Sequence, residues 1–118
     1  MAIKNILILD DDQFVRAIIR NRLESAGFHC TELSNGKHLS KTFQQYEIDL
    51  LITDIVMDEK DGFEVFDEVK MIKGPDFPVI AISSTSTYLL MAEYLGAKAI
   101  FQKPVDFDQL LAALQSLD

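Results

Sequence analysis

The stretch Ile48-Asp49-Leu50-Leu51-Ile52-Thr53-Asp54 decides the fold and points toward the function. Its apolar run is typical of a strand that is buried on both faces, as in the middle of a parallel sheet. A carboxylate at the end of such a strand is costly to bury, so Asp54 is the first candidate for chemistry. Two other apolar runs also end in charged groups, because Ile6–Leu9 leads into Asp10-Asp11-Asp12 and a later run leads into Lys103-Pro104.

Amphipathic segments alternate with these apolar runs along the whole chain. Strict alternation of strands and helices predicts a five-stranded parallel sheet with helices on both faces. Right-handed crossovers make this a doubly wound α/β fold. The strands are expected at Ile3–Leu9, Phe28–Leu33, Leu50–Thr53, Val79–Ile82 and Ala99–Gln102, and the helices near Gln13–Ala26, Lys37–Tyr46, Phe63–Ile72, Tyr88–Leu95 and Phe107–Leu117.

Composition sets limits on the class of protein. The 118 residues and the absence of a linker or repeat predict one domain spanning 1–118. Eleven basic and 19 acidic residues give a net charge of -8, which argues against direct binding to nucleic acid. No stretch of about 18 apolar residues is present, so we expect no membrane span. With no room for a signal peptide before the first strand and with Cys30 as the single cysteine, we expect a cytoplasmic location.

The candidate functional residues all follow strands. Ligands of open α/β sheets bind beyond the carboxyl ends of the strands, where Asp10, Asp11, Asp54, Ser83 and Lys103 are expected to meet. Three carboxylates in one crevice repel each other, and a divalent cation relieves this repulsion. An all-oxygen set favours Mg²⁺. The cation, the lysine ammonium and the serine hydroxyl together suit a phosphoryl group, which a carboxylate nucleophile can accept as an acyl phosphate.

Taken singly, each of these residues could have an ordinary structural role. An acidic run is commonly a solvated turn or a helix cap, and a serine or lysine after a strand is commonly a loop residue. Four strands that all end in suitable groups favour a functional site instead. Two other classes on a similar fold fit poorly: Asp10–Asp12 would repel the phosphate of a flavin carrier, and Val56 stands where an Asp-x-Asp phosphatase needs its second aspartate.

Six motifs occur in a fixed order and with characteristic spacing. They are Ile6–Asp12, Asp54–Met57, Asp61–Glu64, Pro78–Ser83, Gly96-Ala97 and Lys103-Pro104. In residue type, order and spacing they resemble the receiver domain of two-component response regulators, over essentially the whole chain. The resemblance implies a flavodoxin-like (CheY-like) sheet with strand order 2-1-3-4-5.

The resemblance also implies a role for each site residue. Asp54 would be the phosphoacceptor, taking its phosphoryl group from a phosphohistidine on a sensor histidine kinase or a histidine phosphotransfer protein. Asp11, Asp54 and the backbone carbonyl of Val56 would bind Mg²⁺ directly, and Asp10 would do so through water. Ser83 and Lys103 would contact the phosphoryl group, and the Lys103-Pro104 peptide would be cis. The domain would catalyse its own phosphotransfer and autodephosphorylation, and it would signal through altered binding to a downstream protein target.

Three features depart from the family pattern. Asp58 stands where the family usually has proline, and Ile100 stands where an aromatic residue often acts as a switch. The segment from Ser83 to Gly96 is about two residues shorter than is common. These departures leave one alternative open, a degenerate receiver that acts as a phosphorylation-independent interaction module.

Overall fold

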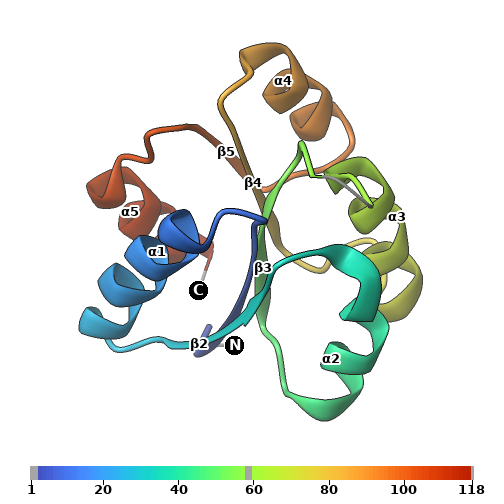
Figure 1. The fold of residues 1–118 in the computed structure, drawn as a ribbon, viewed down its shortest axis with the longest axis horizontal. Coiled ribbons are helices and arrows are strands. Elements are labelled where there is room, and N and C mark those ends of the chain that lie inside the picture. The colour runs from blue at the N-terminus through green and yellow to red at the C-terminus, as the bar shows by residue number, and fades with distance from the viewer. Residues whose placement is uncertain (1–2, 58–59, 118) are drawn as a thin grey trace.

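The computed structural model describes residues 3–57 and 60–117. Five parallel strands form one sheet in the order β2-β1-β3-β4-β5, and helices cover both of its faces (Figure 1). The predicted doubly wound fold and its strand order are therefore confirmed. The strands are β1 (Asn5–Leu9), β2 (His29–Leu33), β3 (Leu50–Asp54), β4 (Val79–Ser83) and β5 (Ala99–Gln102). The helices are α1 (Gln13–Ser25), α2 (Leu39–Gln45), α3 (Gly62–Lys73), α4 (Ser86–Tyr94) and α5 (Phe107–Leu117), with a 3₁₀ turn at Gly36–His38.

The two faces of the sheet carry separate hydrophobic cores, because successive side chains of a strand point to opposite faces. On one face, isoleucines of the central strands, such as Ile8 and Ile52, pack against Ile19 and Leu23 of α1 and Leu110 of α5. Figure 1 shows these two helices together on one side of the sheet. Packing on this face fixes the position of strand β1 relative to helix α1.

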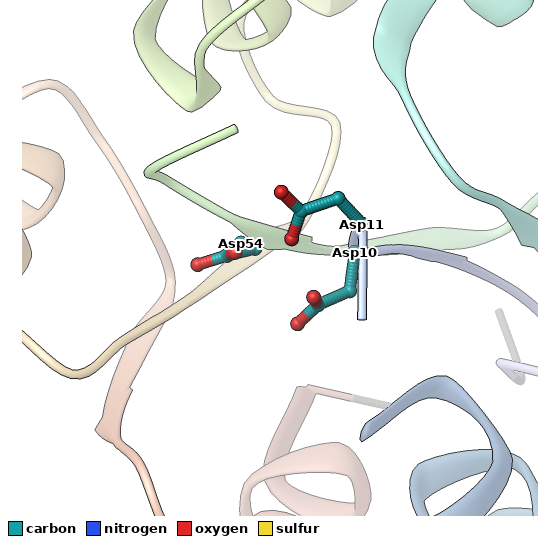
Figure 2. A group of neighbouring side chains, drawn as sticks. All are labelled: Asp10, Asp11 and Asp54. Atoms are coloured by element: carbon teal, nitrogen blue, oxygen red, sulfur yellow. The ribbon is translucent and has the colours of Figure 1, made fainter. Parts of the chain in front are cut away.

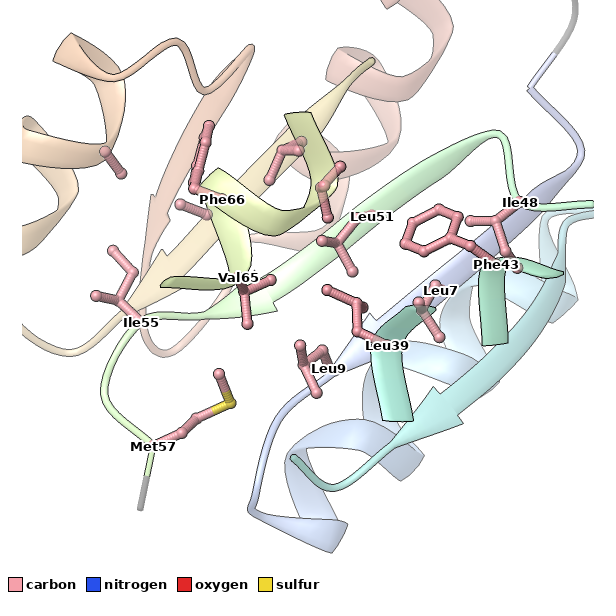
Figure 3. Close-up of a cluster of buried hydrophobic side chains, with 14 of the residues drawn as sticks. Leu7, Leu9, Leu39, Phe43, Ile48, Leu51, Ile55, Met57, Val65 and Phe66 are labelled. Atoms are coloured by element: carbon pink, nitrogen blue, oxygen red, sulfur yellow. The ribbon is translucent and has the colours of Figure 1, made fainter. Parts of the chain in front are cut away.

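The other face packs against α2, α3 and α4 (Figure 1). Leu9 and Leu51 from the sheet meet Leu39 of α2 and Val65 and Phe66 of α3 there (Figure 3). A Leu side chain gains roughly 2 kcal/mol when it is fully buried, so the two cores together hold the central strands firmly. The chain immediately after Asp54 is anchored in the same core, because Ile55 and Met57 are buried in it.

Short polar caps let the helices begin close to the strand ends. The carboxylate of Asp12 accepts hydrogen bonds from the backbone N–H groups of Phe14 and Val15 at the start of α1. Asp61 caps α3 in the same way, accepting from Glu64 N–H at 2.9 Å. Such caps typically contribute about 1 kcal/mol each. None of the helices in the described ranges is long enough to cross a bilayer, the longest having 13 residues.

Two helices differ in detail from the sequence expectation. The helix expected over Lys37–Tyr46 is divided into the 3₁₀ turn and α2, because the side chain of Asn35 accepts from Lys37 N–H and tightens the first turn. Helix α4 begins at Ser86, two residues before the expected start at Tyr88. Its N-cap residue, Thr85, makes no side-chain hydrogen bond to the helix, so the usual capping signal is missing.

Candidate functional site at the carboxyl edge of the sheet

The parallel register brings the ends of four strands to one edge of the sheet. Asp54 is the last residue of β3 and pairs in register with Ile82 of β4. Ser83, the last residue of β4, pairs with Gln102, and Lys103 follows immediately. Asp10 comes directly after β1, whose last residue pairs with Thr53. The structure therefore brings these residues to one edge, as the sequence predicted.

Three carboxylates form an acidic cluster at this edge. One oxygen each from Asp10, Asp11 and Asp54 lies within 4.8 Å of the others. Figure 2 shows the carboxylates of Asp10 and Asp11, at the end of β1, turned to the same side as that of Asp54. Asp10 is fully buried and Asp54 is only 5% exposed, whereas Asp11 is open to solvent. Solvent and ions can therefore reach the cluster on the side where Asp11 lies.

Lys103, which directly follows β5, places its ammonium beside two of these carboxylates. Its ammonium Nζ lies 2.9 Å from Oδ2 of Asp10 and 3.4 Å from Oδ2 of Asp54. Apart from this ion pair, Oδ2 of Asp10 has no hydrogen-bond partner among the described residues. The peptide bond between Lys103 and Pro104 is cis, as the resemblance implied.

The protonation behaviour of Asp54 reflects this setting. Burial raises the pKa of Asp54 to about 6, and the negative charge of Asp10 adds to the increase. The ammonium of Lys103 and the Ile55 N–H group, which donates to Oδ1 at 2.9 Å, oppose the increase without cancelling it. Burial would lower the pKa of Lys103, but its hydrogen bond to Asp10 and the charges of Asp54 and Asp10 outweigh burial and raise it.

This imbalance fits a bound cation. One ammonium faces three carboxylates, and burial together with the charge of Asp10 disfavours the charged form of Asp54 and raises its pKa. A hard divalent ion with oxygen ligands would supply the missing positive charge. The residues present therefore fit a metal, and the structure shows an acidic cluster that could hold one.

Of the other predicted site residues, Ser83 and Val56 lie at or beside the same edge, whereas Ile100 lies within β5. Ser83 is buried there, and its Oγ accepts a hydrogen bond from Thr85 N–H at 3.1 Å. Val56 follows the acidic cluster on the loop after β3, with its side chain exposed. The role of its carbonyl stays a prediction. Ile100 is half-buried in β5 and packs against the core on the α2, α3 and α4 face. Asp58 lies outside the described residues.

Two further residues also shape the site: Gly62, which belongs to the Asp61–Glu64 motif but received no role from sequence, and Arg16, which lies in no quoted motif. The N–H of Gly62 donates to the carbonyl of Ile55 at 2.7 Å, and a Cβ at this position would stand 2.6 Å from Ile55 Cα. Only glycine allows α3 to approach the loop after β3 this closely. Arg16 reaches from α1 to the carbonyl of Asp10. The helix cap Asp61, which directly precedes Gly62, could have pointed to the role of Gly62. No feature of the sequence pointed to the contact of Arg16 with Asp10.

Comparisons with known proteins agree with this geometry. A family model described as the response regulator receiver domain matches residues 6–115. The DNA-binding transcriptional regulator NtrC of Bradyrhizobium sp. (strain RP501 Parasponia) is 31% identical over 109 residues, covering 91% of this chain but only 22% of that protein. The chemotaxis protein CheY of Listeria monocytogenes serovar 1/2a is 32% identical over 113 residues, covering 93% of this chain and 94% of that protein.

Solved structures give the same result for the fold. The chemotaxis protein CheY4 of Vibrio cholerae aligns with a TM-score of 0.87 at 23% identity, covering 99% of this chain and 100% of that one. The chain spans less than a quarter of the NtrC relative, so it corresponds to one part of that longer protein. Because the family model covers nearly the whole chain, the protein belongs to the response regulator receiver family.

Proposed function

We propose that residues 1–118 form one receiver domain that accepts a phosphoryl group on Asp54. The observation that carries this proposal is the position of Asp54, which ends a central strand beside Asp10 and Asp11 with Oδ2 at 3.4 Å from Lys103 Nζ. A nearly buried carboxylate with an accessible cation site and a facing ammonium is suited to attack phosphorus. The complete cluster argues against the degenerate alternative.

The reaction is an in-line displacement at phosphorus. Oδ2 of Asp54 attacks the phosphoryl group of a phosphohistidine, a P–O bond forms, and the P–N bond breaks with its electron pair going to the imidazole. Oδ1 is the less suitable nucleophile, because it already accepts the N–H of Ile55. Lys103 stabilises the charge on the phosphoryl oxygens, and the hydroxyl of Ser83 turns from Thr85 N–H to donate to one of them.

Mg²⁺ is the cation that we assign to the acidic cluster. Asp11, Asp54 and the carbonyl of Val56 would hold it directly, and Asp10 would do so through water. When bound, it supplies positive charge that offsets the carboxylates and the incoming phosphoryl group. Asp10 and Lys103 are paired at 2.9 Å in this structure, an ion pair that keeps the ammonium next to the site.

The partners follow from this chemistry. The phosphoryl donor would be a sensor histidine kinase or a histidine phosphotransfer protein, and the output would be altered binding to a downstream protein. The net charge of -8 supports a protein target rather than direct contact of this chain with nucleic acid. We place the protein in the cytoplasm, where the lone Cys30 stays reduced.

Intact-mass measurement tests the proposal directly. With Mg²⁺ and a small phosphodonor, the protein should gain one phosphoryl group, and Asp54→Asn should gain none. Asp12→Asn is the matched control, because asparagine also caps helices and Asp12 lies outside the cluster. A chelator should abolish labelling. Labelling that survives Asp54→Asn, or no labelling of the wild type, would contradict the proposal.

A further inference from the structure

Arg16 connects helix α1 to the end of strand β1. Its Nη1 donates to the backbone carbonyl of Asp10 at 2.6 Å, and its Nε lies 3.1 Å from Oε1 of Glu32 on β2. Only 15% of the side chain is exposed. The guanidinium is therefore held by Glu32 and by the backbone of Asp10, which is one of the three residues of the acidic cluster.

We infer that Arg16 is a positioning residue for the cation site, an inference that rests on the proposed function. The carbonyl of Asp10 belongs to the peptide plane that joins Asp10 to Asp11. A bond to this oxygen therefore sets the direction in which both carboxylates leave the backbone. Two further bonds hold the same turn, because Asp10 N–H donates to Leu33 O at 3.2 Å and Asp12 N–H donates to Asp10 Oδ1 at 2.9 Å.

Glu32 keeps the guanidinium in this orientation. It lies between two arginines, 3.1 Å from Arg16 Nε and 2.8 Å from Arg20 Nη1, and Arg20 also pairs with Glu24 at 3.2 Å. The hydrogen bond from Arg20 lowers the pKa of Glu32, and burial, which acts in the opposite direction, does not cancel it. With Glu32 charged, Arg16 is held by its Nε and directs Nη1 to a carbonyl. Without this partner, its positive charge would be drawn to the nearby carboxylates, where it would compete with a cation.

The sign of the effect on metal binding separates positioning from simple electrostatics. Arg16 is a positive charge near a cation site, so Coulomb's law alone predicts that its removal tightens Mg²⁺ binding. A positioning role predicts the opposite, because the carboxylates lose their orientation when the Asp10 carbonyl is released. Loss of a residue that orients metal ligands typically weakens metal affinity about 10-fold or more.

Isothermal titration calorimetry with Mg²⁺ alone tests this inference on the full chain. Arg16→Met should raise the dissociation constant about 10-fold. Arg16→Lys should restore part of the affinity, because an ammonium can still donate to the carbonyl. Arg20→Met is the matched control, since it removes the same charge from the same network, and the hydrogen bonds of the Arg20 side chain to described residues go to Glu32 and Glu24 and not to the cluster. Its dissociation constant should stay within about 2-fold of the wild type, or decrease, as expected for a charge effect alone.

Each outcome decides the inference. Unchanged or tighter binding in folded Arg16→Met would overturn it, as would an equal loss in Arg20→Met. If Arg16→Met does not fold, Arg16→Lys and Arg20→Lys replace the pair, and only the first should lose affinity. Wild-type protein that binds Mg²⁺ but is not labelled at Asp54 would contradict the proposed function and leave the positioning role standing. Wild-type protein that binds no Mg²⁺ would remove both.

Discussion

The central strands and the edge strand β5 contribute different groups to the site, and the fold encloses them to different degrees. Strands β1, β3 and β4 are almost entirely buried, and Asp10, Asp54 and Ser83 at their carboxyl ends are buried as well. Strand β5 is half-buried, and Lys103 follows it with a side chain that is 22% exposed. The acids are thus fixed in the core, whereas the lysine that partly compensates them comes from a more open strand.

The site can therefore be changed at some positions without loss of the fold. Moving a central carboxylate disturbs both cores, because each central strand packs against helices on both faces. Removing Lys103 leaves both cores in place and changes the charge balance of the site, where Oδ2 of Asp10 loses its ion-pair partner. The comparison therefore predicts that function and stability separate most clearly at β5.

Replacing Lys103 gives the largest expected effect. Lys103→Met keeps an apolar stem but removes the ammonium near Asp10 and Asp54. Labelling at Asp54 should become at least about 100-fold slower, since one lost charge-stabilising donor commonly costs that much. The rate of mass gain with a small phosphodonor checks this.

The matched control is Lys98→Met, at an exposed lysine just before β5. It should be labelled at the wild-type rate. Circular dichroism should show both variants folded. If Lys103→Met unfolds while Lys98→Met does not, the lysine is part of the structural framework and the comparison fails.

Much of this arrangement could be predicted from sequence because buried parallel strands have a distinctive composition. Short apolar runs such as Ile6–Leu9 and Leu50–Thr53, each followed directly by an aspartate, are typical of strands buried on both faces. Once the strands are parallel, the carboxyl ends share an edge, so the meeting of Asp10, Asp54 and Lys103 follows from topology. The expectation of a cis peptide at Lys103-Pro104 came from the family resemblance and is confirmed.

Other features depend on three-dimensional paths that a sequence does not display. Arg16 is one basic residue on a surface helix, and nothing in the pattern of α1 shows that it bends back to the carbonyl of Asp10. The close approach of Gly62 to Ile55 depends on how α3 enters the core. The start of α4 was misplaced because Thr85 offers no capping bond and apolar residues such as Leu90 lie on its exposed side.

The pH dependence of stability gives the next largest effect. Because the pKa of Asp54 is raised to about 6, the folded protein binds this proton more tightly than the unfolded chain does. Charged Asp54 therefore destabilises the metal-free protein above pH 6, and stability is regained as the pH falls from about 7 toward 4. A shift of about two pKa units corresponds to roughly 2 to 3 kcal/mol.

Urea unfolding of the wild type and Asp54→Asn isolates this contribution, because all other titrating groups are shared. At pH 7 without metal, Asp54→Asn should be the more stable protein, and its advantage should shrink as the pH falls through 6. Mg²⁺ should reduce the advantage at pH 7, because a cation stabilises the charged carboxylate. A difference between the two proteins that stays constant from pH 7 to pH 4.5 would show that Asp54 is not strained by its surroundings.

The smallest expected effect is on the free energy of unfolding, when one methylene group is removed from β4 or from β5. Ile80 in β4 is fully buried, whereas Ile100 in β5 is half-buried. Each Ile→Val substitution removes one methylene group, so the free energy of unfolding should fall by about 1.5 kcal/mol for Ile80→Val and about 0.5 kcal/mol for Ile100→Val. Urea denaturation at constant pH measures both. Equal losses would mean that β5 is as tightly enclosed as the centre of the sheet, and the expected tolerance of the fold to Lys103→Met would then lose its physical basis.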